Sequence, residues 1–530
     1  MTEAEGWYRS PRGLAWRIFL TAWVVYSLHY STDVVREHYL AIGVARGTFG
    51  VPEEYRGLHP DVFEVPGRGL RVGNNPGASI VAAVPILIFR PVIRALNGYV
   101  KTQRGHEVGE AGLDTAAPTD LASTSSRAVG RIQAPKFDTP RPNARKFYAE
   151  AYRRGLDVEL GLVSLVTQWF CMAPLSALGV VLIFWVLRRL TRKDREAVLG
   201  ALIYGFATPV FLRAGYLNHN LLVGIASLYG FALVSGLWPG RGSARARSGW
   251  SGFMAGLGLL MDYSAAIIAL VLGAQVIVTA LRDRTRREAV WESVSFGFGA
   301  LGPVLVLWIF QYASFGHAFL PGQHWMPRVH YSTMGYNGMV FPRLDLFLLL
   351  AGSPQYGLFL VSPILLLGLA APFFGWVRER LGRVESWLCL SLTLALWLFN
   401  AGNLYTFLQR DTGVRYMIPA VPFLFLPAFL VWRRLPFVWA GAILLVSFTI
   451  NWAHAMYRFV LSPIGVFESL GRLFVSGFNL PVLRFLQFSG DQYGDFAKNG
   501  VSALPLFVLT AGILALVWAA PEGRRGVPVE

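Results

Sequence analysis

The sequence predicts an all-α polytopic membrane protein, and three observations support this prediction. Of the 530 residues, 54% are hydrophobic and only 15% are charged, whereas a soluble globular chain carries about 25% charged residues. The apolar residues gather in runs that suit a bilayer core, which takes about 20 residues of helix to cross. Lys and Arg collect in short loops between these runs, as cytoplasmic loops do. We therefore expect the chain to meet lipid over most of its surface.

About twelve or thirteen apolar runs fit a crossing helix. The first, 14–30, begins among Arg9, Arg12 and Arg17 and lacks a small-residue cleavage site after it, which indicates an uncleaved anchor. The two short runs 249–261 and 264–281 flank Asp262. The remaining runs are 78–96, 158–187, 196–213, 221–238, 290–313, 357–376, 384–400, 416–432, 436–452 and 501–519.

The basic loops predict the orientation. From 188 onward every second loop is basic, and such loops stay in the cytoplasm. The clusters are Arg188, Arg189, Arg192, Lys193 and Arg195; Arg241, Arg245 and Arg247; Arg282, Arg284, Arg286 and Arg287; Arg378, Arg380 and Arg383; Arg433 and Arg434; and Arg524 and Arg525. We expect a cytoplasmic N-terminus, an integral protein of a bacterial inner (plasma) membrane, and an active site on the outer face. The loops 32–77, 214–220, 314–345, 401–415 and 453–500 share that face, as does Asp262.

One conflict concerns the run 78–96. If the N-terminus is cytoplasmic and both 14–30 and 78–96 cross the membrane, the run 158–187 begins inside. One further crossing would then end it outside, yet Arg188 places its end inside. Either 78–96, which contains Pro85, Arg90 and Pro91, is re-entrant or lies along the membrane, or 158–187 hides a broken extra pass. The segment 97–157 is expected to be a mobile polar loop, because 110–145 is rich in Ala, Thr, Ser, Pro and charge.

Composition and motifs exclude several functions. The formal charge of +17 suggests a nucleic-acid partner only if it forms a stripe on a folded surface, and here topology explains the basic clusters. Cys171 and Cys389 lie in apolar runs, so neither a disulfide framework nor a thiolate metal site is expected. Neither GxxxxGK[ST] nor GxSxG occurs, which disfavours ATP-driven chemistry and serine hydrolysis.

Polar groups near the bilayer are the default functional candidates, and the first outer loop holds several. Asp33 follows the first run directly, where its carboxylate can accept a proton from an acceptor hydroxyl; the alternatives are a helix cap or an ion pair with Arg36. Glu37 is either a second acid or a partner of Arg36. Asn75 opens the helix at 78, whose free amides suit an anion, although such a turn serves any helix start.

Further candidates lie in the later outer loops. His219 stands in a short turn and Asp262 between two short runs, where capping a helix is the alternative role. The loop 314–345 is expected to cover a sugar or headgroup, with His324 and Arg328 among its polar residues, and it contains no HExxH spacing for a metal.

Arg415 opens the run 416–432, and a guanidinium at a helix start can bind phosphate oxygens. Arg410 and Tyr416 flank it and are assigned to the same phosphate. The alternative is a local ion pair between Arg415 and Asp411, which stands four residues earlier.

Four segments together resemble the GT-C polytopic glycosyltransferases, which include protein O-mannosyltransferases and the aminoarabinose transferases of lipid A. They are Asp33 with Tyr39, Ala41 and Gly47–Phe49; Asn75–Ser79 with Pro85; Gly352–Phe359 with Ser362 and Pro363; and Arg415 and Tyr416 with Pro419 and Pro422. The resemblance implies a GT-C-like catalytic module at 1–452, followed by an outer loop and a last helix at 453–530. Tyr356 in the third segment is assigned to substrate binding.

The resemblance also implies a function. The donor would be a polyprenyl-phosphate sugar, the acceptor a lipid, glycan or protein, Asp33 the inverting base with Glu37 or His219 as helpers, and Arg415 a contact to the lipid phosphate. Arg36, Asn75, Asp262, His324 and Arg328 complete the substrate-binding candidates. Val34 stands where the family often has a second acid, so a divalent cation stays an alternative that no paired-acid motif supports, and no cofactor or metal ligand is assigned.

Two other classes compete with this interpretation. A polytopic transporter or lipid-linked-sugar flippase would also hold polar residues in its bundle, but such proteins usually contain inverted repeats, and none is found in the sequence. An O-antigen ligase or polymerase differs from the proposed enzyme only in its acceptor. Membrane lipid is an expected partner and nucleic acid is not.

Overall fold

The structure of the protein is a computed structural model that describes residues 10–105, 142–240, 242–458, 461–489 and 500–519. The described residues are mostly helical, and among them the only strands form one antiparallel hairpin, β1 (Val62–Val65) and β2 (Gly69–Val72). This agrees with the prediction of an all-α membrane protein. The Arg241, Arg524 and Arg525 positions and the central part of the predicted mobile loop lie outside the described residues.

The main helices follow the predicted runs, except for 357–376, which the structure divides into short α-helices and 3₁₀ turns. They are α2 (Pro11–Leu28), α4 (Gly77–Gly105), α6 (Asp157–Thr167), α7 (Ala173–Thr191), α8 (Asp194–Phe206), α10 (His219–Val234), α11 (Ala244–Met261), α12 (Ala265–Asp283), α13 (Arg286–Phe315), α18 (Arg383–Ala401), α19 (Val421–Trp432), α20 (Phe437–Tyr457) and α24 (Leu504–Trp518). A π-helical turn, η2 (Gln168–Met172), joins α6 to α7.

Shorter helices connect the main ones. They are α3 (Arg36–Ala45), α5 (Pro142–Arg153), α9 (Val210–Ala214), α14 (Leu344–Gly352), α15 (Leu358–Val361), α16 (Leu366–Ala370), α17 (Gly375–Leu381), α21 (Val466–Ser476) and α22 (Pro481–Phe488). The 3₁₀ turns are η1 (Glu53–Tyr55), η3 (Gly322–Trp325), η4 (His330–Thr333), η5 (Pro363–Leu365), η6 (Ala371–Phe373), η7 (Leu404–Asp411) and η8 (Ile418–Ala420). The ends of the predicted loop 97–157 are thus helical, in α4 and α5.

Six helices of the described chain are long and apolar enough to cross a membrane: Gly77–Gln103, Asp157–Thr191, Ala265–Asp283, Arg286–Phe315, Arg383–Ala401 and Phe437–Tyr457. Shorter apolar helices occupy His219–Val234, Pro363–Phe373, Ile418–Trp432 and Leu504–Trp518. The runs predicted at 14–30, 196–213 and 249–261 also form helices, namely α2, α8 with α9, and α11, which do not meet these criteria.

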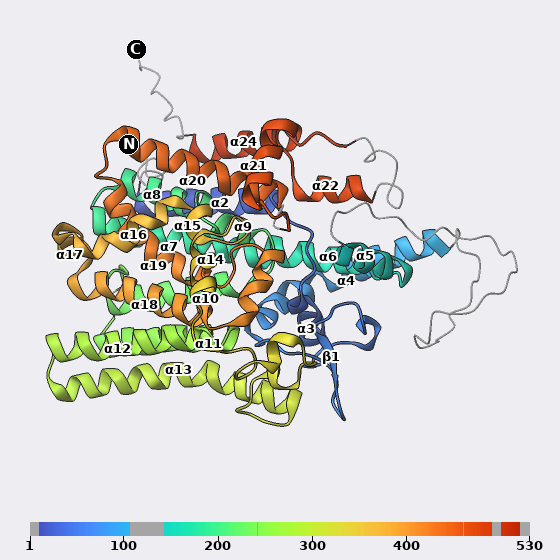
Figure 1. Cartoon of the computed structure of the whole chain (residues 1–530), viewed down its shortest axis with the longest axis horizontal. Coiled ribbons are helices and arrows are strands. Elements are labelled where there is room, and N and C mark those ends of the chain that lie inside the picture. The colour runs from blue at the N-terminus through green and yellow to red at the C-terminus, as the bar shows by residue number, and fades with distance from the viewer. Residues whose placement is uncertain (1–9, 106–141, 241, 459–460, 490–499, 520–530) are drawn as a thin grey trace, which may run out of the picture.

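The helices form a bundle with two distinct ends (Figure 1). One end carries α3 and the β1–β2 hairpin, and the other carries α17; we call them the α3 end and the α17 end. The predicted basic loops that the structure describes lie at the α17 end, where Arg433 pairs with Glu196 at 2.9 Å. A cavity of about 200 Å³ at the same end is lined by Arg247, Arg282 and Arg284 together with other residues.

α4 is one continuous helix that runs through Pro85 and Pro91. It begins beside the last turn of α11, where the Asn75 side chain donates to the Leu259 carbonyl at 2.6 Å. It then runs antiparallel to the α6–η2 segment, because Phe89 stacks on Phe170 and the Asn97 amide donates to Glu159. α4 therefore leaves the bundle at the α3 end (Figure 1). By length and composition the helix over 77–103 could cross a membrane, and both interpretations of the run 78–96 stay predictions.

Close backbone contact joins α11 to α13, which lie side by side along one edge of the bundle (Figure 1). Gly252 and Gly256 follow a small-xxx-small spacing, which lets membrane helices approach closely. A side chain at Gly252 would collide with the Phe296 carbonyl oxygen, and one at Gly256 would meet the Ala300 backbone. The absence of a side chain at these positions therefore sets the distance between the two helices.

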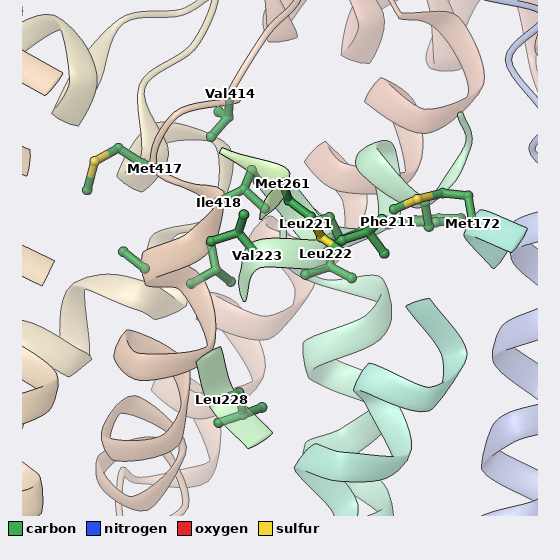
Figure 2. Packing of buried hydrophobic residues seen from close by; sticks show 14 of the residues in the cluster. Met172, Phe211, Leu221, Leu222, Val223, Leu228, Met261, Val414, Met417 and Ile418 are labelled. Atoms are coloured by element: carbon green, nitrogen blue, oxygen red, sulfur yellow. The ribbon is translucent and has the colours of Figure 1, made fainter. Parts of the chain in front are cut away.

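The buried apolar core reaches up to the polar residues of the α3 end. Figure 2 shows Leu221, Leu222 and Val223 at the start of α10, together with Phe211 and Ile418 from neighbouring segments. Phe211 and Ile418 are at most 1% exposed. This packing fixes the first turn of α10, and so the position of the polar residue that opens it.

Candidate functional site

His219 is the centre of a buried polar cluster at the α3 end. It is the first residue of α10, whose N-cap Asn218 accepts a hydrogen bond from the Leu221 amide at 3.0 Å. The His219 Nδ1 nitrogen lies 2.8 Å from Glu37 Oε1, and both side chains are only 4% exposed. Its Nε2 nitrogen lies 3.4 Å from Asp262 Oδ2. One imidazole thus joins two carboxylates that come from separate elements.

Arginines surround this cluster. Arg415 Nη2 lies 3.5 Å from His219 Nε2, and the Arg415 guanidinium stands over the Tyr416 ring at 5.4 Å. Arg36 Nε lies 3.5 Å from Glu37 Oε1, while Arg36 Nη1 lies 2.9 Å from Asp61 Oδ2. We call Glu37, His219, Asp262, Arg36, Asp61 and Arg415 the histidine cluster.

The electrostatics of the histidine cluster keep its carboxyl groups ionised. Burial raises the pKa of Glu37, but the hydrogen bond from His219 and the charge of Arg36 outweigh it, so this pKa lies well below its ordinary value. Burial likewise raises the pKa of Asp262, and the hydrogen bonds from His219 and Ser264 outweigh it and lower this pKa to about 2. Each carboxylate is therefore committed to its partner and is a weak proton acceptor.

Asp33 lies apart from the histidine cluster, on the wall of a cavity. Its Oδ2 oxygen lies 2.8 Å from Arg458 Nη2, and Arg458 is the residue that caps α20. The cavity has a volume of about 390 Å³ and is lined by Ser31, Thr32, Asp33, Ala144, Tyr148, Met456, Tyr457, Arg458, Leu461, Ser462, Pro463, Glu468, Pro481, Arg484, Phe485 and Phe488. We call it the Asp33 cavity. It combines charged groups with apolar walls from α20, α22 and the segment before α21.

A fully buried arginine stands between the two sites. Arg213 of α9 is 0% exposed. Its guanidinium donates to the carbonyl oxygens of Val414, Thr412 and Gly413 at 2.5, 2.9 and 2.8 Å. It also contacts the hydroxyl of Tyr216, whose ring lies 4.7 Å beneath the Arg458 guanidinium. Arg213 therefore holds the loop that precedes Arg415 and, through Tyr216, supports Arg458.

The structure brings together the sequence-predicted residues Glu37, His219, Asp262, Arg36 and Arg415. Asp33 pairs with Arg458 and not with Arg36. In the described residues no ion pair joins Arg415 to Asp411; Asp411 lies 3.8 Å from Arg410 instead.

The other predicted residues lie elsewhere. Arg410 is largely exposed, with 59% of its side chain accessible. Asn75 donates to the Leu259 carbonyl at the end of α11, a contact that the sequence did not predict. His324 and Arg328 are exposed on the loop 314–345, and Tyr356 is buried at 4% exposure. Main-chain hydrogen bonds tie this loop to the end of α18, for example from Val340 to Gly402 at 2.8 Å.

Sequence reasoning missed Arg213, Arg458, Arg484 and Asp61. Arg213 carried a signal, because it is a charged residue at the end of an apolar run, and such residues mark functional sites. Arg458 and Arg484 stand among ordinary loop arginines, so no local pattern distinguishes them. Among the described residues no group of three or more His, Cys, Asp and Glu side chains has the geometry to hold a metal ion. Comparisons with protein-family models, curated proteins and solved structures found no match.

Proposed function

We propose that this protein is a membrane glycosyltransferase that moves a sugar from a polyprenyl-phosphate donor to an acceptor hydroxyl at the α3 end of the bundle. The observation that carries the proposal is the Asp33 cavity, which joins two carboxylates, two arginines and apolar walls in one space. We further propose a GT-C-like arrangement of about twelve or thirteen crossing segments in a bacterial inner membrane. The basic loops at the α17 end would face the cytoplasm, so the cavity would open on the outer side.

The cavity suits both parts of a lipid-linked donor. Met456, Phe485 and Phe488 offer apolar surface to a prenyl chain. Arg458 and Arg484 offer the guanidinium groups that bind phosphate oxygens.

The chemistry is a displacement at the anomeric carbon. The acceptor oxygen forms a bond to this carbon while the bond from the carbon to the phosphate oxygen breaks. Asp33 takes the proton of the acceptor hydroxyl, and polyprenyl phosphate leaves with the bonding electron pair. The attack comes from the side opposite the leaving group, so the anomeric configuration inverts. Arginine near the phosphate would stabilise the charge that develops on the leaving group.

Asp33 is a better candidate for the base than Glu37. The Glu37 carboxylate is almost fully buried, its pKa is lowered and His219 occupies it. The Asp33 side chain is 27% exposed, on a cavity wall. We propose that the histidine cluster instead binds hydroxyl groups of the sugar or of the acceptor. Arg415 does not line the cavity, so we assign it to the cluster, where it faces His219.

The test is release of polyprenyl phosphate from a panel of polyprenyl-phosphate sugars by the purified protein, with membrane extract as the source of acceptors. Asp33→Asn should lower release by about 10² to 10⁴-fold, because it removes the general base. Asp345→Asn is the matched control, since Asp345 is an exposed carboxylate paired with Arg343. Donor binding without release by the wild type would favour the flippase alternative. Release that does not depend on Asp33 would refute the proposed mechanism.

A further inference from the structure

The Asp33–Arg458 ion pair connects two segments far apart in sequence, and both residues line the Asp33 cavity. Asp33 Oδ2 and Arg458 Nη2 are 2.8 Å apart, with side chains 27% and 11% exposed. In this pair, the Asp33 oxygen that would accept the proton of the acceptor hydroxyl is bound to the Arg458 guanidinium. The same Arg458 is also needed for the phosphate. Both groups of the proposed reaction are therefore engaged with each other in this structure.

The backbone on both sides of the pair is in an unfavourable conformation. Thr32, next to Asp33, has φ 59°, and Arg458 itself has φ 52°. Non-glycine residues rarely adopt this left-handed region, and such residues cost about 1–3 kcal/mol each and cluster at ligand clamps and switch regions. Arg458 is the C-cap of α20, where helices commonly enter this region, whereas Thr32 directly precedes the other member of the pair. The surrounding packing must hold them there.

Arg458 has a second support that does not depend on Asp33. Its guanidinium lies 4.7 Å from the centre of the Tyr216 ring, a cation–π contact. Arg213, which is fully buried, in turn contacts the Tyr216 hydroxyl. Arg458 can therefore stay on the cavity wall when its carboxylate partner changes.

A phosphate competes well with Asp33 for this guanidinium. Phosphate and guanidinium form bidentate, charge-assisted hydrogen bonds, and Arg484 lines the same cavity and adds a second positive charge. We propose that Arg458 exchanges Asp33 for the phosphate of the donor, so that donor binding releases the Asp33 carboxylate to act as the base. This inference rests on the proposed function. It makes the base competent only when the donor is in place.

The exchange predicts that one substitution of a cavity residue tightens the binding of polyprenyl phosphate. Asp33→Asn removes the group that the phosphate must displace, so it should tighten binding of polyprenyl phosphate by about fivefold or more, as expected for a coupling free energy between two competing partners. Arg458→Gln should weaken binding by about tenfold or more, because it removes the phosphate contact. In the Arg458→Gln background, Asp33→Asn should no longer tighten binding.

The experiment is a binding titration of polyprenyl phosphate to the full-length protein in nanodiscs, for the wild type, both single variants and the double variant. Glu468→Gln shows what the loss of a cavity carboxylate does by itself, because Glu468 lines the same cavity and pairs with Arg472. Arg458→Lys keeps the charge and should retain part of the affinity. Arg458→Lys replaces Arg458→Gln in the titration if gel filtration and thermal unfolding show that Arg458→Gln does not fold.

Three results would overturn the exchange. The first is unchanged or weaker binding in Asp33→Asn. The second is equal tightening in Glu468→Gln, and the third is tightening by Asp33→Asn that persists in the Arg458→Gln background. The second and third results would reflect only the loss of negative charge. The outcome is separable from the proposed function. The predicted binding pattern without any sugar release would leave the exchange standing and refute the transferase. Release that depends on Asp33, without tighter binding in Asp33→Asn, would do the reverse.

Discussion

The contact between His219 and Glu37 should be a strongly coupled pair, and a double-mutant cycle measures this directly. His219→Ala leaves Glu37 as a buried carboxylate whose nearest remaining cation, Arg36, lies 3.5 Å away. Both side chains are only 4% exposed, so solvent screens the pair little. Removal of one partner from a buried pair costs about 3–5 kcal/mol in the free energy of unfolding.

The second arm of the cycle is the same substitution in a Glu37→Gln background. There His219→Ala removes a hydrogen bond to a neutral amide, which contributes about 0.5–1.5 kcal/mol. The coupling free energy between the two residues should therefore be about 2 kcal/mol or more. The assay is a titration of the detergent-solubilised protein with a denaturing detergent, with tryptophan fluorescence and circular dichroism as the two probes of unfolding.

The pH dependence gives the cycle an internal check. The pKa of Glu37 is lowered in the folded protein, whereas an unfolded glutamate has a pKa of about 4.3. The stabilisation from the ionised carboxylate is thus fully present above this value and is lost only as the pH falls through the lower folded-state pKa. The ionised Glu37 carboxylate should therefore contribute as much to the coupling free energy at pH 5 as at pH 7. Additive single substitutions, within about 0.5 kcal/mol, would refute the coupling between His219 and Glu37.

Three further predictions concern residues that position the two sites. Arg213→Met should lower the free energy of unfolding by about 3 kcal/mol, because it leaves the carbonyl oxygens of 412–414 without their charged donor; equal stability in chemical unfolding would count against it. Arg415→Ala should lower sugar transfer by about tenfold through loss of a charged hydrogen bond to a substrate hydroxyl, whereas Arg343→Ala, which alters an exposed pair with Asp345, should leave the rate close to that of the wild type. Gly252→Val should destabilise the protein by about 1–3 kcal/mol through overpacking against α13, while Gly302→Val, at a position with open space around it, should be tolerated in the same thermal unfolding assay.

The residues that carry the proposed chemistry were predictable to different degrees. The polar residues His219, Glu37 and Asp262 stand beside apolar runs. Because polar groups are costly near a bilayer, their presence there marked them as functional candidates. That they form one cluster was not predictable, because His219 and Glu37 are 182 positions apart. The alternatives considered for Asp33 and Arg415 were local partners, Arg36 and Asp411. The structure gives each a partner from elsewhere in the chain, because helix ends that pack side by side are closer than their sequence separation suggests.

The sequence by itself determined that the chain is mostly helical with apolar helices suited to a membrane, and where most of the long helices lie. These properties depend on hydropathy and charge summed over about 20 neighbouring residues. Only the tertiary structure decided the partners. Asp33 meets Arg458 across 425 positions, and Arg213 reaches the loop before Arg415 across about 200. Such pairings follow from which helices pack together, and this depends on contacts such as the glycine-mediated approach of α11 and α13 that no local pattern of hydropathy encodes.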